Sequence, residues 1–204
     1  ELKIRTLTVG DRFPCPAVPT LAIGDANFGH ESIDIGTGPG QFVVDGNDDE
    51  DADDPGELGD LTQHGVCNVT GGIVQDSGPD GVANTVDDVY IGTFPFRTLG
   101  FGVQQGIDAY GSQYTYAVTA GATRWGVGSQ TPGSISNFYV DSTGTAVDTD
   151  LDSIFVIVSH GEDRQGAYLE SGTREGCVSN LSEENCDDDD VFITAMQEEA
   201  RRVA

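Results

Sequence analysis

Five short apolar runs, separated by clusters of glycine and aspartate, limit most strongly what this chain can fold into. The runs are rich in Val, Ile, Tyr, Phe and Thr, and they span residues 89–101, 114–120, 134–142, 153–161 and 190–196. Such runs indicate β-strands. Most of the intervals between them are short, and short intervals favour antiparallel pairing, because a parallel crossover needs a dozen or more residues. The stretch at 154–158 is almost wholly apolar and is therefore expected to be the central strand.

The first third of the chain is expected to be different in character. From residue 14 to about residue 70 there are few strand-length apolar runs and many turn-forming residues, including an acidic insertion at about 45–60. We expect long loops there. Residues 1–10 have tolerable helical spacing before Gly10 and are expected to be the tail of an N-terminal helix. Residues 11–204 then form a single globular domain.

The charge of the chain limits its partners. The formal net charge is -26, from 35 acidic and 9 basic residues. Self-repulsion of this size destabilises a compact state unless cations or salt offset it. Nucleic acid is not expected as a partner, because phosphate binding needs clustered Lys and Arg. Divalent cations are the expected partners; the alternative is that the acids only form a solvated, solubilising surface.

Three acidic segments are candidates for calcium binding. They span residues 76–88, 142–153 and 184–190. Calcium accepts irregular shells of carboxylate and carbonyl oxygens, although the spacing in the first segment does not match an EF-hand. The alternative for each is an aspartate-rich turn whose side chains bond their own backbone. The candidate ligands are Asp76, Asp80, Asn84, Asp87 and Asp88, then Asp148, Asp150 and Asp152, and finally Asp187, Asp188 and Asp189.

The four cysteines indicate disulfides. Cys15, Cys67, Cys177 and Cys186 lack the CxxC spacing of zinc ribbons and thioredoxin-like motifs. Two disulfides in an oxidising compartment are therefore expected. Three pairings are possible. Nearness in sequence favours Cys177 with Cys186, which leaves Cys15 with Cys67.

No motif indicates an enzyme. HExxH, a nucleophile elbow, a Walker loop and a GxGxxG turn before a helix are all absent from the sequence. His160 follows Ser159 in a predicted strand, where neighbouring side chains point to opposite faces, so a structural histidine is expected. A hydrolase that uses paired acids is the least favoured class, because many acids place some pairs close by chance. Asn68 and Asn180 match the short N-x-S/T glycosylation pattern, which also arises often by chance.

Several stretches, taken in order, resemble a known family. They are DRFPCPA at 11–17, FPFRTLGF at 94–101, DAYGSQYTYAVT at 108–119, FVIVSHGEDRQGAYLESG at 155–172 and ENCDDDDVFIT at 184–194. Together they are similar to bacterial prepilin-type proteins, which are the type IV pilins and the pseudopilins of type II secretion. In a subgroup of these proteins the globular domain carries G-x-P-[FW]-R-T-L-G-L, D-x-[WY]-G-x-x-[FIL]-T-Y-A-V and V-x-V-S-H-G, and GRLPCPA follows the long N-terminal helix.

The resemblance implies a fold and a function. The fold is α+β and pilin-like: an antiparallel sheet of about four to six strands with long loops, packed on an N-terminal helix that is mostly missing here. The function is a non-enzymatic subunit of an extracellular filament, which contacts other pilin-like subunits and is anchored in the inner membrane through the helix before assembly. Pseudopilins commonly hold a calcium ion that stabilises the globular domain. The alternative is a secreted, calcium-dependent adhesion or binding module.

One ion pair is also expected inside the motif region. Arg97 interrupts the apolar run of FPFRTLGF. A buried or half-buried arginine needs a carboxylate partner, and Asp108 of DAYG is the candidate.

Overall fold

The computed structural model describes residues 12–33, 67–83, 85–124, 133–140, 146–177 and 185–195. At 139–140, 146–152 and 194–195 it describes the backbone alone. The predicted helix tail at 1–10 and the acidic insertion at 45–60 lie outside the described residues.

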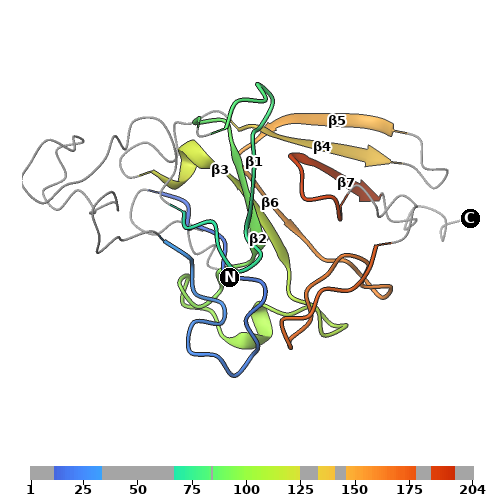
Figure 1. Cartoon of the computed structure of the whole chain (residues 1–204). Helices are drawn as coiled ribbons and strands as arrows, with labels where there is room; N and C mark the ends of the chain where they lie inside the picture. The colour runs from blue at the N-terminus through green and yellow to red at the C-terminus, as the bar shows by residue number, and fades with distance from the viewer. Residues whose placement is uncertain are drawn as a thin grey trace, which may run out of the picture.

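Two β-sheets form the centre of the described chain (Figure 1). The first is antiparallel, with the order β1-β2-β3-β6, and consists of β1 (Val74–Asp76), β2 (Val89–Thr93), β3 (Thr115–Thr119) and β6 (Phe155–Val158). The second has the order β5-β4-β7 and consists of β4 (Ile135–Val140), β5 (Ala146–Ser153) and β7 (Val191–Ala195). The helices of the described residues are two 3-10 turns, η1 (Val103–Gln105) and η2 (Ala120–Thr123).

The predicted β-rich character is confirmed, because each of the five apolar runs contains one strand. Two strands were not predicted. β1 ends at Asp76, the first residue of the first acidic segment, and β5 occupies most of the second segment, where the alternative to a calcium loop was a turn. Alternating residues such as those of β5 suit a strand once a neighbour such as β4 is available to pair with it.

The expectation that 154–158 is the central strand is wrong. β6 lies at the edge of the first sheet, and its Ile157 side chain is 40% exposed. The central strands are β2 and β3, in which every residue is buried. A run of apolar side chains shows that a strand prefers burial, but its neighbours in the sheet decide whether it is central.

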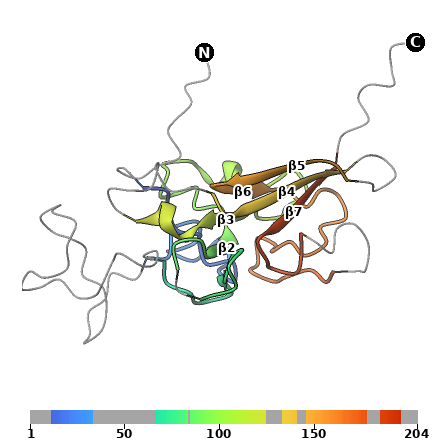
Figure 2. The ribbon, with the colours of Figure 1, turned by 90° about the horizontal axis from the view of Figure 1, so that it is seen from above.

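The purely antiparallel pairing that was expected is also corrected. β4 pairs with β5 in antiparallel fashion but with β7 in parallel. The chain between β4 and β7 includes β5, β6 and the loop at 159–177, which is long enough for a parallel return. Figure 2 shows this loop, in orange, beside β7.

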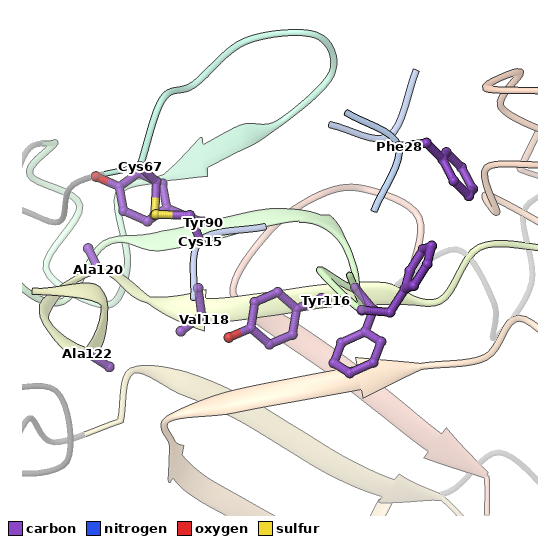
Figure 3. Close-up of a cluster of buried hydrophobic side chains, with 10 residues drawn as sticks. Cys15, Phe28, Cys67, Tyr90, Tyr116, Val118, Ala120 and Ala122 are labelled. Atoms are coloured by element: carbon purple, nitrogen blue, oxygen red, sulfur yellow. A yellow bond between two sulfur atoms is a disulfide. The ribbon is translucent and has the colours of Figure 1, made fainter. Parts of the chain in front are cut away.

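Each face of the first sheet packs against a different layer. On one face, Tyr90, Tyr116 and Val118 pack with Cys15 and Phe28 of the N-terminal segment (Figure 3). Both layers are buried there, which places the larger hydrophobic core between the N-terminal segment and the sheet.

The other face packs against the second sheet. Val89, Ile91 and Ala117 form a cluster with Ile135 of β4 and Phe192 of β7. The register explains the division, since side chains at successive positions of a strand point to opposite faces. Described segments therefore cover both faces of the first sheet, and the packing of an N-terminal helix on it remains a prediction.

Candidate functional site

The first acidic segment forms a closed loop between β1 and β2. Asp76 Oδ1 accepts a hydrogen bond from the backbone N–H of Gly78 at 2.8 Å, and Asp80 Oδ1 accepts one from Val82 at 2.7 Å. Gly78 has a φ of 60°, and a Cβ there would lie 2.1 Å from the carbonyl oxygen of Asp87. The closure of the loop therefore requires glycine. Both aspartates bond their own backbone, as in ordinary aspartate turns.

Asp88 is the buried carboxylate of this segment. Gln75 of β1 donates its side-chain amide to Oδ2, and Thr85 Oγ1 lies 2.9 Å from Oδ1. Thr85 Oγ1 also lies 2.6 Å from Asp87 Oδ1. The backbone oxygen of Asp88 accepts a hydrogen bond from the N–H of Ala120 at 2.7 Å. Because a buried carboxylate is costly without partners, these contacts fasten the end of the loop to the sheet.

The third acidic segment is organised by Arg174, which no sequence pattern singled out. Its guanidinium donates to both carboxylate oxygens of Asp188, at 2.6 and 2.7 Å, and to the carbonyl of Cys186 at 2.8 Å. Nε donates to the Gly166 carbonyl at 3.2 Å, and the guanidinium lies 5.4 Å from the centroid of the Tyr168 ring. Burial opposes the charged form, but the hydrogen bonds and charge of Asp188 outweigh it, so the pKa of Arg174 is raised.

The charge of Asp76, in the first acidic segment, acts on Asp189 and Asp190 of the third segment, just before β7. Burial raises the pKa of Asp189, and the charges of Asp187, Asp190 and Asp76 add to this effect, whereas a hydrogen bond from the Val191 N–H opposes it. Burial also raises the pKa of Asp190, followed by the charge of Asp76. Like charges held together disfavour the ionised form. These carboxylates therefore repel one another when no cation is bound.

Calcium remains a proposal for the acidic segments. Within the described residues, no group of three or more His, Cys, Asp or Glu side chains is arranged to hold a metal ion. Asn84 lies outside these residues. At Asp148, Asp150 and Asp152 of β5 the structure describes the backbone alone. The observed geometry assigns Asp188 to an ion pair with Arg174.

Two of the motif segments meet at the carboxylate of Asp108. Oδ1 accepts hydrogen bonds from the backbone N–H groups of Tyr110 and Ser112, each at 2.9 Å. Oδ2 accepts one from Ser159 Oγ at 2.9 Å. The DAYG turn is thereby joined to the VSHG segment that follows β6.

The expected pairing of Arg97 with Asp108 is not found among the described ion pairs. The local donors described above already use both carboxylate oxygens of Asp108. Arg97 instead donates its backbone N–H to the Gly29 carbonyl at 2.8 Å, and its guanidinium lies 5.9 Å from the centroid of the Phe96 ring.

His160 is held in place within the same region. Its Nε2 lies 2.8 Å from Thr115 Oγ1 of β3, and the ring also bonds the backbone of Gln165. Burial lowers the pKa of His160, and the charge of Arg174 lowers it further against the opposing Gln165 bond. A neutral imidazole has one donor and one acceptor nitrogen. A neutral His160 can therefore hydrogen-bond to Thr115 and to the Gln165 backbone at the same time, which fits a structural role for this histidine.

The expected disulfides are both present. Cys15 is bonded to Cys67 across 52 residues, and Cys177 to Cys186 across 9 residues. Cys15 and Cys67 lie in the core close to Tyr90 (Figure 3). The second disulfide is nearer the surface, because Cys177 is exposed while its partner is buried. Nearness in sequence therefore favoured the observed pairing.

Sequence reasoning missed a second arginine–carboxylate pair, Arg12 with Glu31. The guanidinium donates to Oε2 at 2.9 Å and to Oε1 at 3.2 Å, and Arg12 is almost fully buried. Glu31 Oε2 also accepts the backbone N–H of Cys15 at 3.0 Å. An arginine followed directly by phenylalanine and proline, in a segment that is expected to pack on the core, signals a need for a carboxylate. That signal identifies Arg12 but not its partner, which lies 19 residues away.

Comparison with known proteins shows no relative of this chain: no protein-family model matches it, and neither does any curated protein or solved structure. In the part of the chain that the structure describes, no helix has the length and apolar character needed to cross a membrane.

Proposed function

We propose that this chain is the globular domain of a non-enzymatic structural subunit of an extracellular pilus or pseudopilus-like filament. The observation that carries the proposal is that the prepilin-like motifs come together in one folded unit. Phe94 of FPFRTLGF and Tyr116 of YTYAV share a core with Cys15 of DRFPCPA. Asp108 of DAYG bonds Ser159 of VSHG. Motifs that are far apart in the chain therefore depend on one another for their conformation.

The remaining features suit a subunit that works outside the cell. Two disulfides fit an oxidising compartment. In the proposed assembly, an N-terminal helix anchors each subunit in the bacterial inner membrane and later contacts other pilin-like subunits, in a homo- or hetero-oligomeric filament. The charge of -26 argues against nucleic acid as a partner.

The sequence of the complete gene and the location of its full-length product test this function. We expect a prepilin leader and an apolar segment of about 20 residues before Glu1. The full-length protein, produced together with a prepilin peptidase, should then be found in filaments sheared from the cell surface. A full-length product that is secreted as a free monomer and has no such segment would exclude this function.

A second candidate function is a secreted, calcium-dependent adhesion or binding module. The observation that favours it is that burial, followed by neighbouring negative charge that includes Asp76, raises the pKa values of Asp189 and Asp190. A divalent cation would relieve this repulsion. Calcium is the proposed cofactor under both functions, because a cation that binds only the folded state stabilises it.

The calcium proposal is tested by thermal melts without reducing agent, with calcium and with chelator, together with metal analysis of the same sample. At a hundredfold excess of calcium over its dissociation constant, the gain is about 2.7 kcal/mol. Asp76→Asn is the matched variant, since its amide oxygen can still accept the Gly78 N–H. We expect it to be more stable than the wild type in chelator but to respond less to calcium. An unchanged wild-type melt would exclude calcium.

A further inference from the structure

The turn that follows the first disulfide carries the triplet Asn68, Val69 and Thr70, which matches the N-glycosylation acceptor pattern. The triplet lies at the surface: Val69 is 45% exposed, Thr70 is exposed, and Asn68 is half-buried. Gly71 and Gly72 follow with φ values of 57° and 91°, so the chain turns sharply directly after the triplet. An acceptor triplet next to an exposed turn is accessible to an enzyme.

Contacts on both sides fix the backbone of this segment. The disulfide at Cys67 precedes it. The backbone N–H of Asn68 donates to the Ser32 carbonyl at 2.9 Å, and Ser32 Oγ donates to the Asn68 carbonyl at 3.2 Å. After the triplet, Thr20 Oγ1 donates to the Gly71 carbonyl at 2.7 Å. The folded chain therefore presents the triplet in one conformation.

The side chains that modification requires have no partner in the described part of the chain. The Asn68 amide and the Thr70 hydroxyl form no hydrogen bond within the described part of the chain. Asn185 shows the contrast with an asparagine whose side chain is used by the fold: its amide N–H donates to the Ile193 carbonyl and its amide oxygen accepts the Ile193 N–H, each at 2.8 Å. Modification of Asn185 would break the connection to β7, whereas modification of Asn68 breaks no described contact.

We propose that Asn68 is an N-glycosylation site, modified by a transferase that uses a lipid-linked oligosaccharide phosphate or diphosphate as donor. Asn68 Nδ2 forms a bond to the anomeric carbon of the sugar. The bond from that carbon to the phosphate oxygen breaks, and the lipid-linked phosphate leaves with the electron pair. A base of the transferase takes the amide proton. The Thr70 hydroxyl serves as the recognition group of the triplet.

The inference relies on the extracellular location in the proposed function, but not on filament assembly. A glycan at this position is bulky and polar. It would cover the exposed Val69 side chain and shield the segment next to the first disulfide from proteases.

The test uses the full chain purified from the surface fraction of its own cells. Cleavage at aspartate isolates a peptide that contains Asn68 but not Asn180. This peptide is treated with a glycan-releasing amidase in heavy-oxygen water and analysed by mass spectrometry. We expect a glycan-sized mass excess before treatment, and conversion of residue 68 to heavy-oxygen aspartate after it. Unmodified Asn68 in the surface fraction overturns this inference alone, whereas a chain found only inside the cell overturns the proposed location as well.

Matched variants give a second test. Asn68→Gln removes the acceptor, and Thr70→Val removes the hydroxyl at nearly constant shape, so both should lose the glycan completely. Thr70→Ser keeps the hydroxyl and should retain the glycan. The deglycosylated variants should melt close to the deglycosylated wild type, because neither side chain has a hydrogen-bond partner among the residues that the structure describes. Retention of the glycan in Thr70→Val would overturn the role of the hydroxyl and with it the proposed site.

Discussion

Two regions of the molecule are built from the same parts but differ in burial. Each places an arginine–carboxylate pair beside a disulfide. The first region contains Arg12, Glu31, Cys15 and Cys67, and the second contains Arg174, Asp188, Cys177 and Cys186. The paired side chains are 1% and 10% exposed in the first region, and 31% and 25% exposed in the second.

These two regions show that hydrogen-bond geometry alone does not determine how much an ion pair contributes to the stability of the fold. Both pairs make two hydrogen bonds from the guanidinium to the carboxylate. If one partner is removed, a charge near the surface can return to water, but a charge in the core cannot. We therefore expect the first region to be much more sensitive to change.

The largest effect is expected from Glu31→Gln. This variant leaves the buried guanidinium of Arg12 opposite a neutral amide, although the amide oxygen can still accept the Cys15 N–H. Breaking a buried pair in this way costs about 3–5 kcal/mol. That is a large share of the about 5–15 kcal/mol by which a typical domain is stable. Urea unfolding followed by circular dichroism measures the loss.

Asp188→Asn is the control, because it makes the same chemical change in the second region. A partly solvated pair contributes about 1 kcal/mol or less. Equal losses in Glu31→Gln and Asp188→Asn would contradict the role that we assign to burial.

The disulfides should differ in the same direction. Replacing Cys15 and Cys67 by alanine opens a 52-residue loop, whereas the other disulfide closes only 9 residues. The chain-entropy relation gives losses of about 4 and about 2.5 kcal/mol, respectively. Cavities in the core add to the first value. Guanidinium unfolding of the two double variants tests this order, and a larger loss from Cys177→Ala with Cys186→Ala would reverse the comparison.

Much of the strand content could be predicted from sequence. The way in which the N-terminal segment and the two sheets stack on one another could not. Runs of β-branched and aromatic residues located five strands correctly, because these side chains fit a pleated surface. The packing of the N-terminal segment on β2 depends on Gly92, where a Cβ would lie 2.8 Å from Pro16 Cβ. This glycine lets the N-terminal segment approach the sheet. Hydrophobicity along the chain contains no such information.

In the candidate site the disulfides could be predicted but the ion pairs could not. Nearness in sequence favoured Cys177 with Cys186, and this left Cys15 with Cys67. The ion pair of Arg174 with Asp188 joins the loop after β6 to the segment before β7, and the charge of Asp76 acts on Asp190 from the end of β1. A single sequence with many acids offers each arginine too many equivalent partners.

A smaller effect is expected for the coupling between Arg174 and Asp188. A double-mutant cycle with Arg174→Gln and Asp188→Asn should give about 1 kcal/mol, because the pair is bidentate but partly solvated. The coupling should decrease as salt is added. The pair of Arg164 with Glu175, at 3.9 Å, is the control and should show coupling near zero. Equal coupling in the two pairs would mean that bidentate geometry adds nothing here.

The smallest effect concerns pH and His160, which lies close enough to Arg174 for that charge to lower its pKa. Burial is the largest cause, and the Gln165 bond and the charges of Asp108 and Asp163 act in the opposite direction. Because the folded pKa is below the ordinary histidine pKa of about 6.5, the unfolded chain takes up the proton first as the pH falls below that value. Stability therefore decreases from there down to the folded pKa and is unaffected by this group at higher pH.

The measurement is urea unfolding of the wild type and His160→Gln at about pH 7.5 and about pH 5.5, which bracket the ordinary histidine pKa. The variant should lose less stability on acidification. Asp189 and Asp190 act in the opposite direction in both proteins, since their raised pKa values favour the folded state at low pH. The difference between the two proteins therefore isolates His160.

Arg174→Gln should reduce the pH effect, because it removes a positive charge that lowers the pKa of His160. The same pH dependence in the wild type and His160→Gln would show that the fold does not hold His160 in its neutral form.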